Sequence, residues 1–388
     1  MLNICVKKQS FADGLRDTCF QPSIARLNGV DVLTFQAIYG GDFYGEVQYS
    51  AGNVESGEWS APQVVEPFQW KSCGTADITE AIVDVRSIAL PDNKRILAVG
   101  SSSFYTSRGC AFWDEKIDRR CLPKQRAFYS FFDPVENKWS QAGTIESCDC
   151  GEHGDLRIAC AQMAVMADGK IVLPVYYATD EMIDYANVKW PRQAVKTLIA
   201  QVVGDKLEVV AWSNSLTIAS ERGFVEPSVK FFNGFWYMTI RSEDGRAYIT
   251  TSPDALLWKE ATPWRWCDGT LLDTDSTQQH FVVLNGVLYL CYTRQDPCNK
   301  CVPRFRTPIF IAPVDPVGLT LDRTGEQIVF PLEMRNNIPN MQGNFHCVDL
   351  SVNSAAVADC ALYITPPTAD KAAVYKTELK IAYIKSGE

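Results

Sequence analysis

The stretch that decides the fold reads PSVKFFNGFWYMTI and runs from Pro227 to Ile240. Two apolar runs flank the pair Asn233 and Gly234, which favours a tight two-residue turn because both residues accept positive φ. The stretch therefore predicts a β-hairpin. The same strand–turn–strand pattern recurs at four other places along the chain, which are Pro22–Phe35, Ser87–Val99, Gln162–Val175 and His280–Tyr292.

The repeated hairpins, with almost no helical periodicity around them, predict an all-β chain. Each small sheet has apolar faces that only neighbouring sheets can cover, and radial packing of such sheets is the β-propeller arrangement. We therefore expect one domain over residues 1–388, a six-bladed β-propeller of four-stranded antiparallel sheets. The apolar N-terminal strand in residues 1–8 is expected to pair with the last blade and close the ring. The expected blades cover residues 15–70, 75–145, 155–215, 220–265, 275–335 and 340–388.

A second repeated feature is a turn that ends in a tryptophan, at Trp59, Trp139 and Trp258. In each turn an Asp or Asn side chain can bond the turn backbone while the indole packs on the sheet. We interpret these tryptophans as structural residues and not as residues that stack on a sugar.

Composition and charge exclude some partners. The chain is 46% hydrophobic and 21% charged, which is typical of a folded globular protein. Its formal net charge of -9 argues against nucleic acid, whose binding needs clustered Lys and Arg. No apolar run approaches the roughly 18 residues of a membrane helix, and no signal peptide is visible at the start. We expect no nucleic-acid or membrane partner and leave the oligomeric state open.

The chain contains 14 cysteines. A high, even count suits disulfides in an oxidising compartment, whereas several of these cysteines lie in strand-like apolar runs, where a free thiol acts as a small hydrophobe. We favour the cytoplasm over secretion and leave secretion open. The pairs Cys148/Cys150 and Cys298/Cys301 leave a zinc site, local disulfides or free thiols open, and Cys110 and Cys121 leave a hairpin disulfide open.

The motif VEPSV at Val225–Val229, followed by TIRS at Thr239–Ser242, resembles the sialidase superfamily segment that carries a catalytic glutamate and one arginine of an arginine triad. The turn at Ser252–Trp258 is similar to a degenerate Asp-box. The hairpin Met166–Tyr176 resembles the third blade of that family, and the segments Thr277–Gly286 and Arg304–Ala312 are similar to a bacterial sialidase-like group. The resemblance implies a glycoside hydrolase that needs no organic cofactor.

The sequence departs from the family pattern at the places that hold the substrate carboxylate. Arg241 fits one of the three arginine places, but the first-blade place falls near Gln21 and the fifth-blade place near Gln279 and His280. The tyrosine nucleophile of the family would fall near Phe345 and His346. We therefore expect cleavage of an anionic or acidic glycan by an exo-acting enzyme that lacks the complete sialidase machinery.

Three residues are candidates for acid–base catalysis. Glu226 lies at a strand entry near the expected axis, where burial tunes a carboxyl group for proton transfer, although an ion pair with Arg222 or Arg241 is the structural alternative. Asp42, in the loop after two glycines, is a second carboxylate of the kind that glycoside hydrolysis requires, or an ordinary turn residue. His280 opens the fifth hairpin and titrates near neutrality, or is a hydrogen-bonded strand residue.

Basic and polar residues are candidates for holding the substrate anion. Arg241 ends an apolar strand and needs either an anionic ligand or a carboxylate such as Glu226 or Glu243. Arg304 and Arg306 alternate along a strand-like segment, which puts both guanidinium groups on one face, unless they belong to a solvated edge strand. We add four further candidates from the other loops, which are Arg86, Arg157, Gln279 and His346.

Three other functions remain open at this point. A five-bladed arabinanase-type glycosidase also carries an acid at a Glu-Pro strand entry, but the aspartate it needs in the first blade is replaced by Gln21. A polysaccharide lyase would use His280 with a tyrosine for proton transfer. A non-catalytic glycan-binding propeller would need no acid or base. The sequence shows no metal motif, and we expect neither a metal nor a cofactor.

Overall fold

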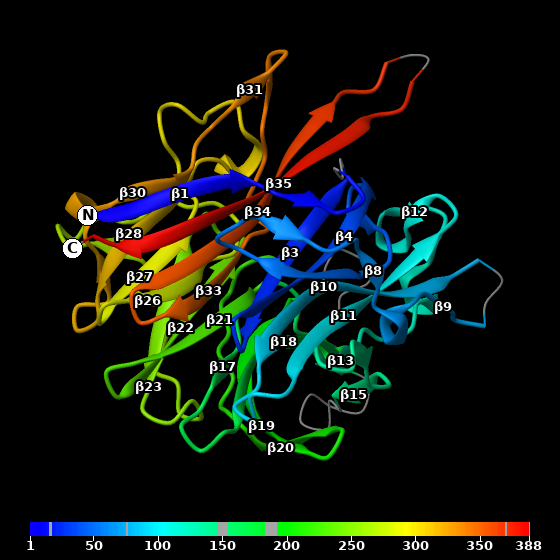
Figure 1. Cartoon of the computed structure of the whole chain (residues 1–388), viewed down its shortest axis with the longest axis horizontal. Helices are drawn as coiled ribbons and strands as arrows, with labels where there is room; N and C mark the ends of the chain where they lie inside the picture. Colours follow the sequence, from blue (N-terminus) through cyan, green and yellow to red (C-terminus); the bar gives the residue numbers. More distant parts are fainter. Residues whose placement is uncertain (15–17, 75–76, 146–153, 183–191, 369–370, 388) are drawn as a thin grey trace.

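The computed structural model describes residues 1–388 except 15–17, 75–76, 146–153, 183–191, 369–370 and 388. The described chain consists of β-sheets, and no α-helix occurs in these residues, so the all-β prediction is confirmed (Figure 1). Short 3-10 turns join some strands, at Glu66–Phe68, Ala111–Trp113, Arg119–Cys121, Asp180–Met182, Pro303–Phe305 and Arg323–Gly325.

The described strands form six sheets of four or more strands, numbered I to VI here in chain order. Sheet I contains β3 Cys19–Leu27, β4 Val30–Gly40, β6 Gln48–Asn53 and β7 Glu58–Trp59, with the short strands β2 Ser10–Phe11, β5 Phe43–Tyr44 and β8 Gln63–Val64. Sheet II contains β10 Thr79–Ala89, β11 Ile96–Thr106, β13 Ala127–Asp133 and β14 Lys138–Trp139, with β9 Lys71–Ser72, β12 Gly109–Cys110 and β15 Gly143–Ile145. Sheet III contains β16 Asp155–Arg157, β17 Ala164–Val165, β18 Ile171–Ala178, β19 Ala194–Val203 and β20 Lys206–Trp212.

The second half of the chain forms the other three large sheets. Sheet IV contains β21 Phe224–Phe232, β22 Phe235–Ser242, β23 Ala247–Ser252 and β24 Thr262–Pro263. Sheet V contains β25 Arg265–Trp266, β26 His280–Leu284, β27 Val287–Tyr292, β28 Ile309–Asp315, β29 Thr320–Leu321 and β30 Gln327–Phe330. Sheet VI contains β33 His346–Ser351, β34 Ser354–Thr365, β35 Val374–Ser386 and β1 Leu2–Lys8. A separate two-stranded hairpin pairs β31 Met334–Arg335 with β32 Ile338–Pro339.

The N-terminal strand pairs with the C-terminal one, as the sequence predicts. β1 runs antiparallel to β35 from Leu2 opposite Ser386 to Lys8 opposite Lys380. Figure 1 shows the two strands side by side at the ends of the colour scale. Because this pairing joins the two ends of the chain, sheet VI is complete only when both ends have been brought together.

Neighbouring sheets contact one another in chain order. β3 contacts β10, β11 contacts β16, β18 contacts β21, β21 contacts β26, and β26 contacts β33. β33 in turn contacts β3, so the series of contacts returns to its start. Apolar side chains between neighbouring sheets form the core, for example Leu97, Leu173 and Leu198 between sheets II and III. This arrangement places the entries of the first strands close together.

The turns form as the sequence predicts. Asn28, Asn233 and Asn285 adopt φ of 52°, 46° and 47°, and the glycine after each also has positive φ. In the tryptophan turns, one side-chain oxygen accepts two backbone N–H groups, with Asn53, Asp133 and Asp254 as the acceptors. The indoles of Trp59 and Trp258 are buried, which agrees with their structural interpretation.

Candidate active site

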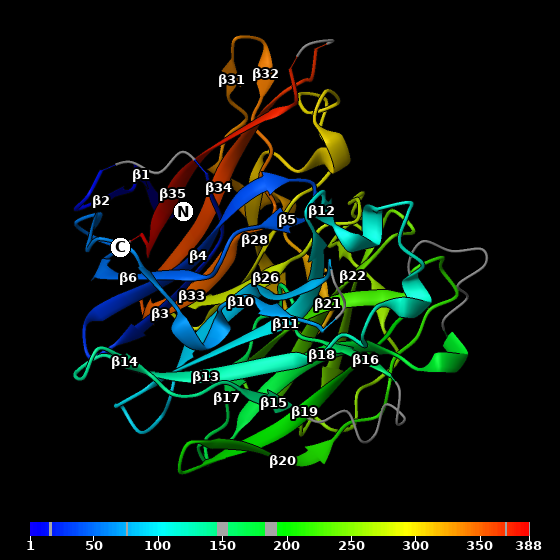
Figure 2. The same cartoon turned by 90° about the vertical axis from the view of Figure 1, so that its right-hand side faces the viewer.

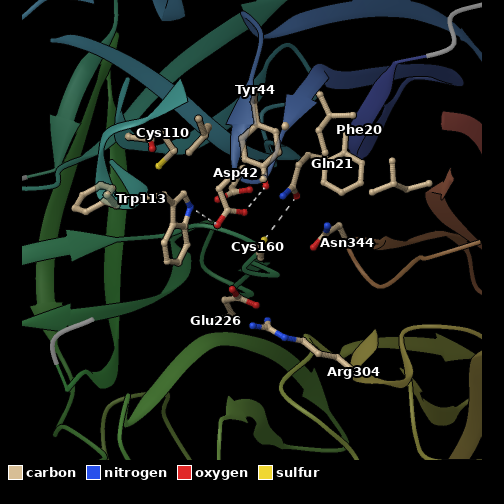
Figure 3. Close-up of a pocket in the computed structure, with 18 of the residues that line it drawn as sticks. Phe20, Gln21, Asp42, Tyr44, Cys110, Trp113, Cys160, Glu226, Arg304 and Asn344 are labelled. Atoms are coloured by element: carbon tan, nitrogen blue, oxygen red, sulfur yellow. Dashed lines mark hydrogen bonds between the residues drawn. The ribbon is translucent and has the colours of Figure 1, made fainter. Parts of the chain in front are cut away.

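A cavity of about 440 Å³ collects side chains from all six sheets. Among the residues that line it are six of the predicted site residues, which are Asp42, Arg157, Glu226, Arg241, Arg304 and Arg306. Figure 3 shows carboxyl, amide and thiol groups from different sheets pointing into this space. The structure therefore brings together residues from the first, third, fourth and fifth predicted blades.

The floor of the cavity is formed by residues in an unusual backbone conformation. Gln21, Asp84, Cys160 and Glu226 have φ of 54°, 56°, 57° and 48°. Irregularities in strand pairing occur at Gln21, Asp84 and Glu226, where β3, β10 and β21 each lose register with the next strand. A bulge of this kind re-aims a side chain at the end of a strand, and here it directs polar groups into the cavity.

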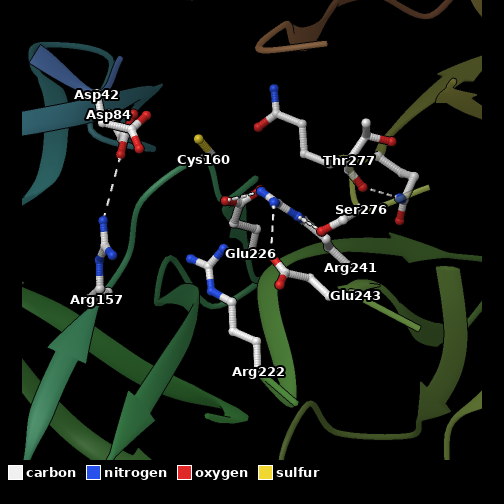
Figure 4. Close-up of polar contacts among 12 residues, drawn as sticks. Asp42, Asp84, Arg157, Cys160, Arg222, Glu226, Arg241, Glu243, Ser276 and Thr277 are labelled. Atoms are coloured by element: carbon white, nitrogen blue, oxygen red, sulfur yellow. Dashed lines mark hydrogen bonds and ion pairs between the residues drawn. The ribbon is translucent and has the colours of Figure 1, made fainter. Parts of the chain in front are cut away.

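Glu226 and Arg241 form a buried ion pair at the floor. Arg241 Nη1 donates to Glu226 Oε1 at 2.6 Å, and Arg241 Nε donates to Ser276 Oγ at 2.8 Å (Figure 4). Glu243 lies 3.5 Å from Arg241 and 2.9 Å from Arg222. Burial alone would raise the pKa of Glu226, but Arg241 and Arg222 outweigh it and lower this pKa to about 2. Glu226 is therefore ionised throughout the neutral and mildly acidic range.

Asp84 lies on the same floor in a different electrostatic state. Its Oδ2 is 3.9 Å from Arg157 Nη2, and its buried Oδ1 has no hydrogen-bond partner among the described residues (Figure 4). Burial raises the pKa of Asp84 to about 6, against the opposing effect of Arg157 and Arg86. Asp84 is thus a carboxyl group that can hold a proton at mildly acidic pH.

Sequence reasoning missed Asp84, although a signal was present. Asp84 lies three residues before the second repeated hairpin, whereas Gln21 and Glu226 come directly before the first and the fourth. Aligning the hairpins by their turns would have placed these three residues within one position of one another. The prediction instead weighed each loop separately and singled out Arg86 from this segment.

Asp42 lies at the mouth of the cavity, in the loop between β4 and β5. Its side chain accepts a hydrogen bond from Tyr44 Oη at 3.0 Å and another from Trp113 Nε1 at 3.2 Å (Figure 3). Asp42 is exposed, and its charge is among the causes that raise the pKa of Asp84. The two aspartates therefore interact across the cavity wall.

Arg304 and Arg306 line the cavity, but not as alternating residues of a strand. They lie at a 3-10 turn, Pro303–Phe305, in which Arg304 has φ of 55°. The strand expected there is wrong, because the strand that follows, β28, begins only at Ile309. Neither guanidinium group forms an ion pair among the described residues. Burial, together with the charges of Arg241 and Arg304, lowers the pKa of Arg306.

The structure places four predicted site residues outside the cavity lining, which are Arg86, Gln279, His280 and His346. His280 is fully buried, its Nδ1 lies 2.9 Å from Ser228 Oγ, and burial followed by the charge of Arg86 lowers its pKa to about 3. The same two causes hold the pKa of His346 well below its ordinary value. Both histidines are therefore neutral near pH 7, and the premise that His280 titrates there is wrong.

The register of the inner strands explains why these residues lie outside the cavity lining. Ser228 lies two residues after Glu226, beyond the bulge, and its hydroxyl faces His280 in the interior below the floor. Gln279 accepts a hydrogen bond from Thr239 Oγ1 in the same interior, at 3.0 Å. Arg86 donates to Gln21 Oε1 at 3.3 Å from beneath the floor. These residues contact the floor from the side opposite the cavity.

The described residues contain no group of three or more His, Cys, Asp or Glu side chains arranged to hold a metal ion. Cys110 and Cys121 form no disulfide with each other, and neither do Cys298 and Cys301. Cys148 and Cys150 lie outside the described residues. Within the described part of the chain, no helix has the length and apolar character needed to cross a membrane.

The fold is similar to that of several solved structures. A protein of unknown function from Dyadobacter fermentans DSM 18053 matches with a TM-score of 0.64 at 13% identity, over 100% of this chain and 99% of that chain. Trypanosoma rangeli sialidase in complex with the inhibitor DANA matches with a TM-score of 0.58 at 12% identity, over 99% of this chain. NanB matches with a TM-score of 0.61 at 10% identity, over 95% of this chain and 68% of that chain.

The chain therefore has a sialidase-like fold, and identities this low show the fold alone. It spans 59% of the length of the Trypanosoma rangeli sialidase that it matches. No protein-family model matches the chain, and no curated protein matches it in sequence.

Proposed function

We propose that this chain is a sialidase-like glycoside hydrolase that cleaves a glycosidic bond in an acidic glycan. The observation that carries the proposal is the pair Arg304 and Arg306, which line the cavity without a carboxylate partner among the described residues. Guanidinium groups that line a cavity and form no ion pair favour a carboxylate or sulfate ligand. Two carboxyl groups with separated pKa values, about 6 for Asp84 and about 2 for Glu226, lie on the floor of the same cavity, so that at mildly acidic pH Asp84 is protonated while Glu226 is ionised.

We propose further that residues 1–388 form a single six-bladed propeller, with sheets I to VI as the blades and β1 closing sheet VI. The closed series of contacts between neighbouring sheets supports this arrangement, and so does the similarity to sialidase structures. A five-bladed arabinanase-type arrangement would leave one of the six large sheets unassigned. A lyase that uses His280 lacks support, because His280 is buried outside the cavity.

In the proposed mechanism Arg304, Arg306 and Arg241 bind the substrate anion. Protonated Asp84 is the reservoir of the proton that the leaving oxygen takes up, and the exposed carboxylate of Asp42 exchanges this proton with solvent. Pairs of carboxyl groups whose environments separate their pKa values are a known basis for such a division of roles.

The reaction is written as a displacement by water. Water attacks the anomeric carbon, the bond to the leaving oxygen breaks, and the proton of the attacking water passes to solvent. Glu226 remains a carboxylate beside the reacting carbon, where its negative charge stabilises the positive charge of an oxocarbenium-like transition state. Its ion pair with Arg241 keeps that carboxylate in place.

The test is a panel of acidic glycans, incubated with the full chain and followed by mass spectrometry for release of an acidic sugar. For the substrate that emerges, Arg306→Gln should raise KM at least tenfold because one anion contact is lost. Asp84→Asn should lower kcat at least a hundredfold, within the usual contribution of general acid catalysis. Arg246→Gln serves as the matched control, since Arg246 is exposed and does not line the cavity.

Two outcomes would contradict the proposal. Full turnover in both Arg306→Gln and Asp84→Asn would remove these residues from the site. Tight binding of a panel glycan without any change of mass would instead indicate a glycan-binding propeller without catalysis.

A further inference from the structure

The cavity has two walls of opposite character, and they come from different sheets. Sheets III, IV and V and the loops beside them supply the basic wall, formed by Arg157, Arg222, Arg241, Arg304 and Arg306. A second wall is apolar and belongs mainly to sheet VI, which neighbours sheet V and its Arg304–Arg306 loop. We call it the apolar wall and define it as Met341, Leu362, Ile364 and Tyr375.

The apolar wall stands on an extended hairpin. β34 and β35 pair from Ser354 opposite Lys385 out to Thr365 opposite Val374, and the outer half of this hairpin projects beyond the other sheets (Figure 2). Ile364 and Tyr375 are paired neighbours in that outer half. Their side chains therefore flank the cavity above its floor.

The side chains of this wall are only partly covered by the protein. Leu362 belongs to the apolar core between sheets I and VI, whereas Met341, Ile364 and Tyr375 pack against that core and stay half-buried. Apart from the phenol of Tyr375, the wall has no side chain that donates or accepts a hydrogen bond. Hydroxyl groups of a sugar placed there would lose water without gaining partners, whereas an apolar group would gain from burial.

The two walls favour different chemical groups of one ligand. Arg304, which is exposed, and Arg306, which is half-buried, favour an anionic group, and the partly exposed Ile364 and Tyr375 favour an apolar one within the same cavity. A ligand that satisfies both walls is amphiphilic, with a charged group and an apolar part in one cavity.

We infer that the substrate is an acidic sugar joined to an apolar aglycone, such as an aryl or alkyl group, which lies against Ile364 and Tyr375. This inference rests on the proposed function, because it takes the ligand to be a substrate that is hydrolysed. The two-sided binding site itself does not depend on catalysis. It predicts that affinity for a carboxylate grows with the length of an attached alkyl chain.

The experiment titrates the full chain with acetate, butyrate, hexanoate and octanoate and follows binding by calorimetry. Affinity should rise about three- to fourfold for each methylene that the wall buries. Ile364→Ser and, as a second variant, Tyr375→Ser should reduce the increase of affinity with chain length. Arg306→Gln should lower the affinity for all four ligands by a similar factor. Val374→Ser is the matched control, because Val374 neighbours Tyr375 but is exposed and does not line the cavity.

An affinity that does not change with chain length in the unchanged protein would overturn the inference. So would a chain-length dependence that persists in both wall variants. Octanoate binding that ignores Arg306→Gln would do the same, since the chain would then bind elsewhere. Chain-length dependence without hydrolysis of any acidic glycoside would contradict the proposed function and support this inference. Hydrolysis of an acidic glycoside, together with affinities that do not depend on chain length, would support the proposed function and contradict this inference.

Discussion

Glu226 and Asp84 hold matching positions in sheets IV and II and differ in their charge. Both lie at a bulge in the first strand, with φ of 48° and 56°, and both are buried at the cavity floor. Arg241 lies 2.6 Å from Glu226, and the pKa of Glu226 falls to about 2. Arg157 lies 3.9 Å from Asp84, and the pKa of Asp84 rises to about 6. The comparison teaches that the same backbone site can yield a fixed carboxylate or a proton carrier. The distance to the nearest guanidinium decides between them.

The largest effect should come from breaking the tighter pair. Arg241→Met leaves Glu226 buried without its main partner, and we expect the free energy of unfolding to fall by about 3–5 kcal/mol. Arg157→Met should cost less, because Asp84 can take up a proton once Arg157 is removed. Urea unfolding at pH 7 measures both losses. Equal losses in the two variants would refute the contrast between the two sites.

The second effect concerns acid stability. Glu226 has a folded pKa of about 2 against an ordinary 4.5, so its carboxylate stabilises the folded chain above pH 4.5. That contribution, about 3–4 kcal/mol, is lost as the pH falls from 4.5 towards 2. The difference in unfolding free energy between the unchanged protein and Glu226→Gln should therefore shrink by this amount over that range. A difference that is constant with pH would mean that Glu226 titrates normally.

The third effect concerns Asp84, whose contribution to stability changes with pH in the opposite direction to that of Glu226. Asp84 has a folded pKa of about 6 against an ordinary 3.8, so the folded chain binds a proton that the unfolded chain has released. Stability from this group is present below pH 3.8 and is lost as the pH rises through 6, by about 3 kcal/mol. Asp84→Asn should remove this loss. The free energy of unfolding of the variant should therefore rise relative to that of the unchanged protein between pH 4 and 7. No gain over that range would mean that the folded and unfolded chains release the Asp84 proton at the same pH.

The smallest effect tests the coupling between the two aspartates. Asp42 raises the pKa of Asp84 less than burial does, so Asp42→Asn should lower that pKa only slightly. The midpoint of the pH-dependent loss described for Asp84 should move towards lower pH, with a change in stability at pH 7 below about 1 kcal/mol. A shift towards higher pH would show that the two carboxyl groups do not repel each other.

Much of the fold was predictable because it depends on local patterns. Asn-Gly turns require positive φ, and the alternation of strands and turns follows from short apolar runs, so the hairpins and the all-β class were evident. The pairing of Leu2–Lys8 with the last sheet also followed, since an isolated apolar strand needs a partner. The strand expected at Arg304 and Arg306 failed because a left-handed turn there leaves no pattern that alternation can reveal.

The contact within the candidate site was predicted where one hairpin carries both residues. Glu226 and Arg241 lie on adjacent strands of one hairpin, and the structure pairs them as the structural alternative in the sequence had suggested. His280 was misplaced because it begins the regular pairing of β26, where its side chain faces Ser228 in the interior and not the cavity. Asp84 was overlooked because its raised pKa depends on burial by distant parts of the chain.

The sequence by itself determined the strands, the turns and the two residues at the fourth strand entry, since these depend on neighbours within a single hairpin. Only the tertiary structure decided which side chains share the cavity, that Arg304 and Arg306 form no ion pair among the described residues, and that one wall is apolar. The physical reason is that burial and Coulomb interactions depend on distances in space, and here those distances join residues that lie far apart in the sequence.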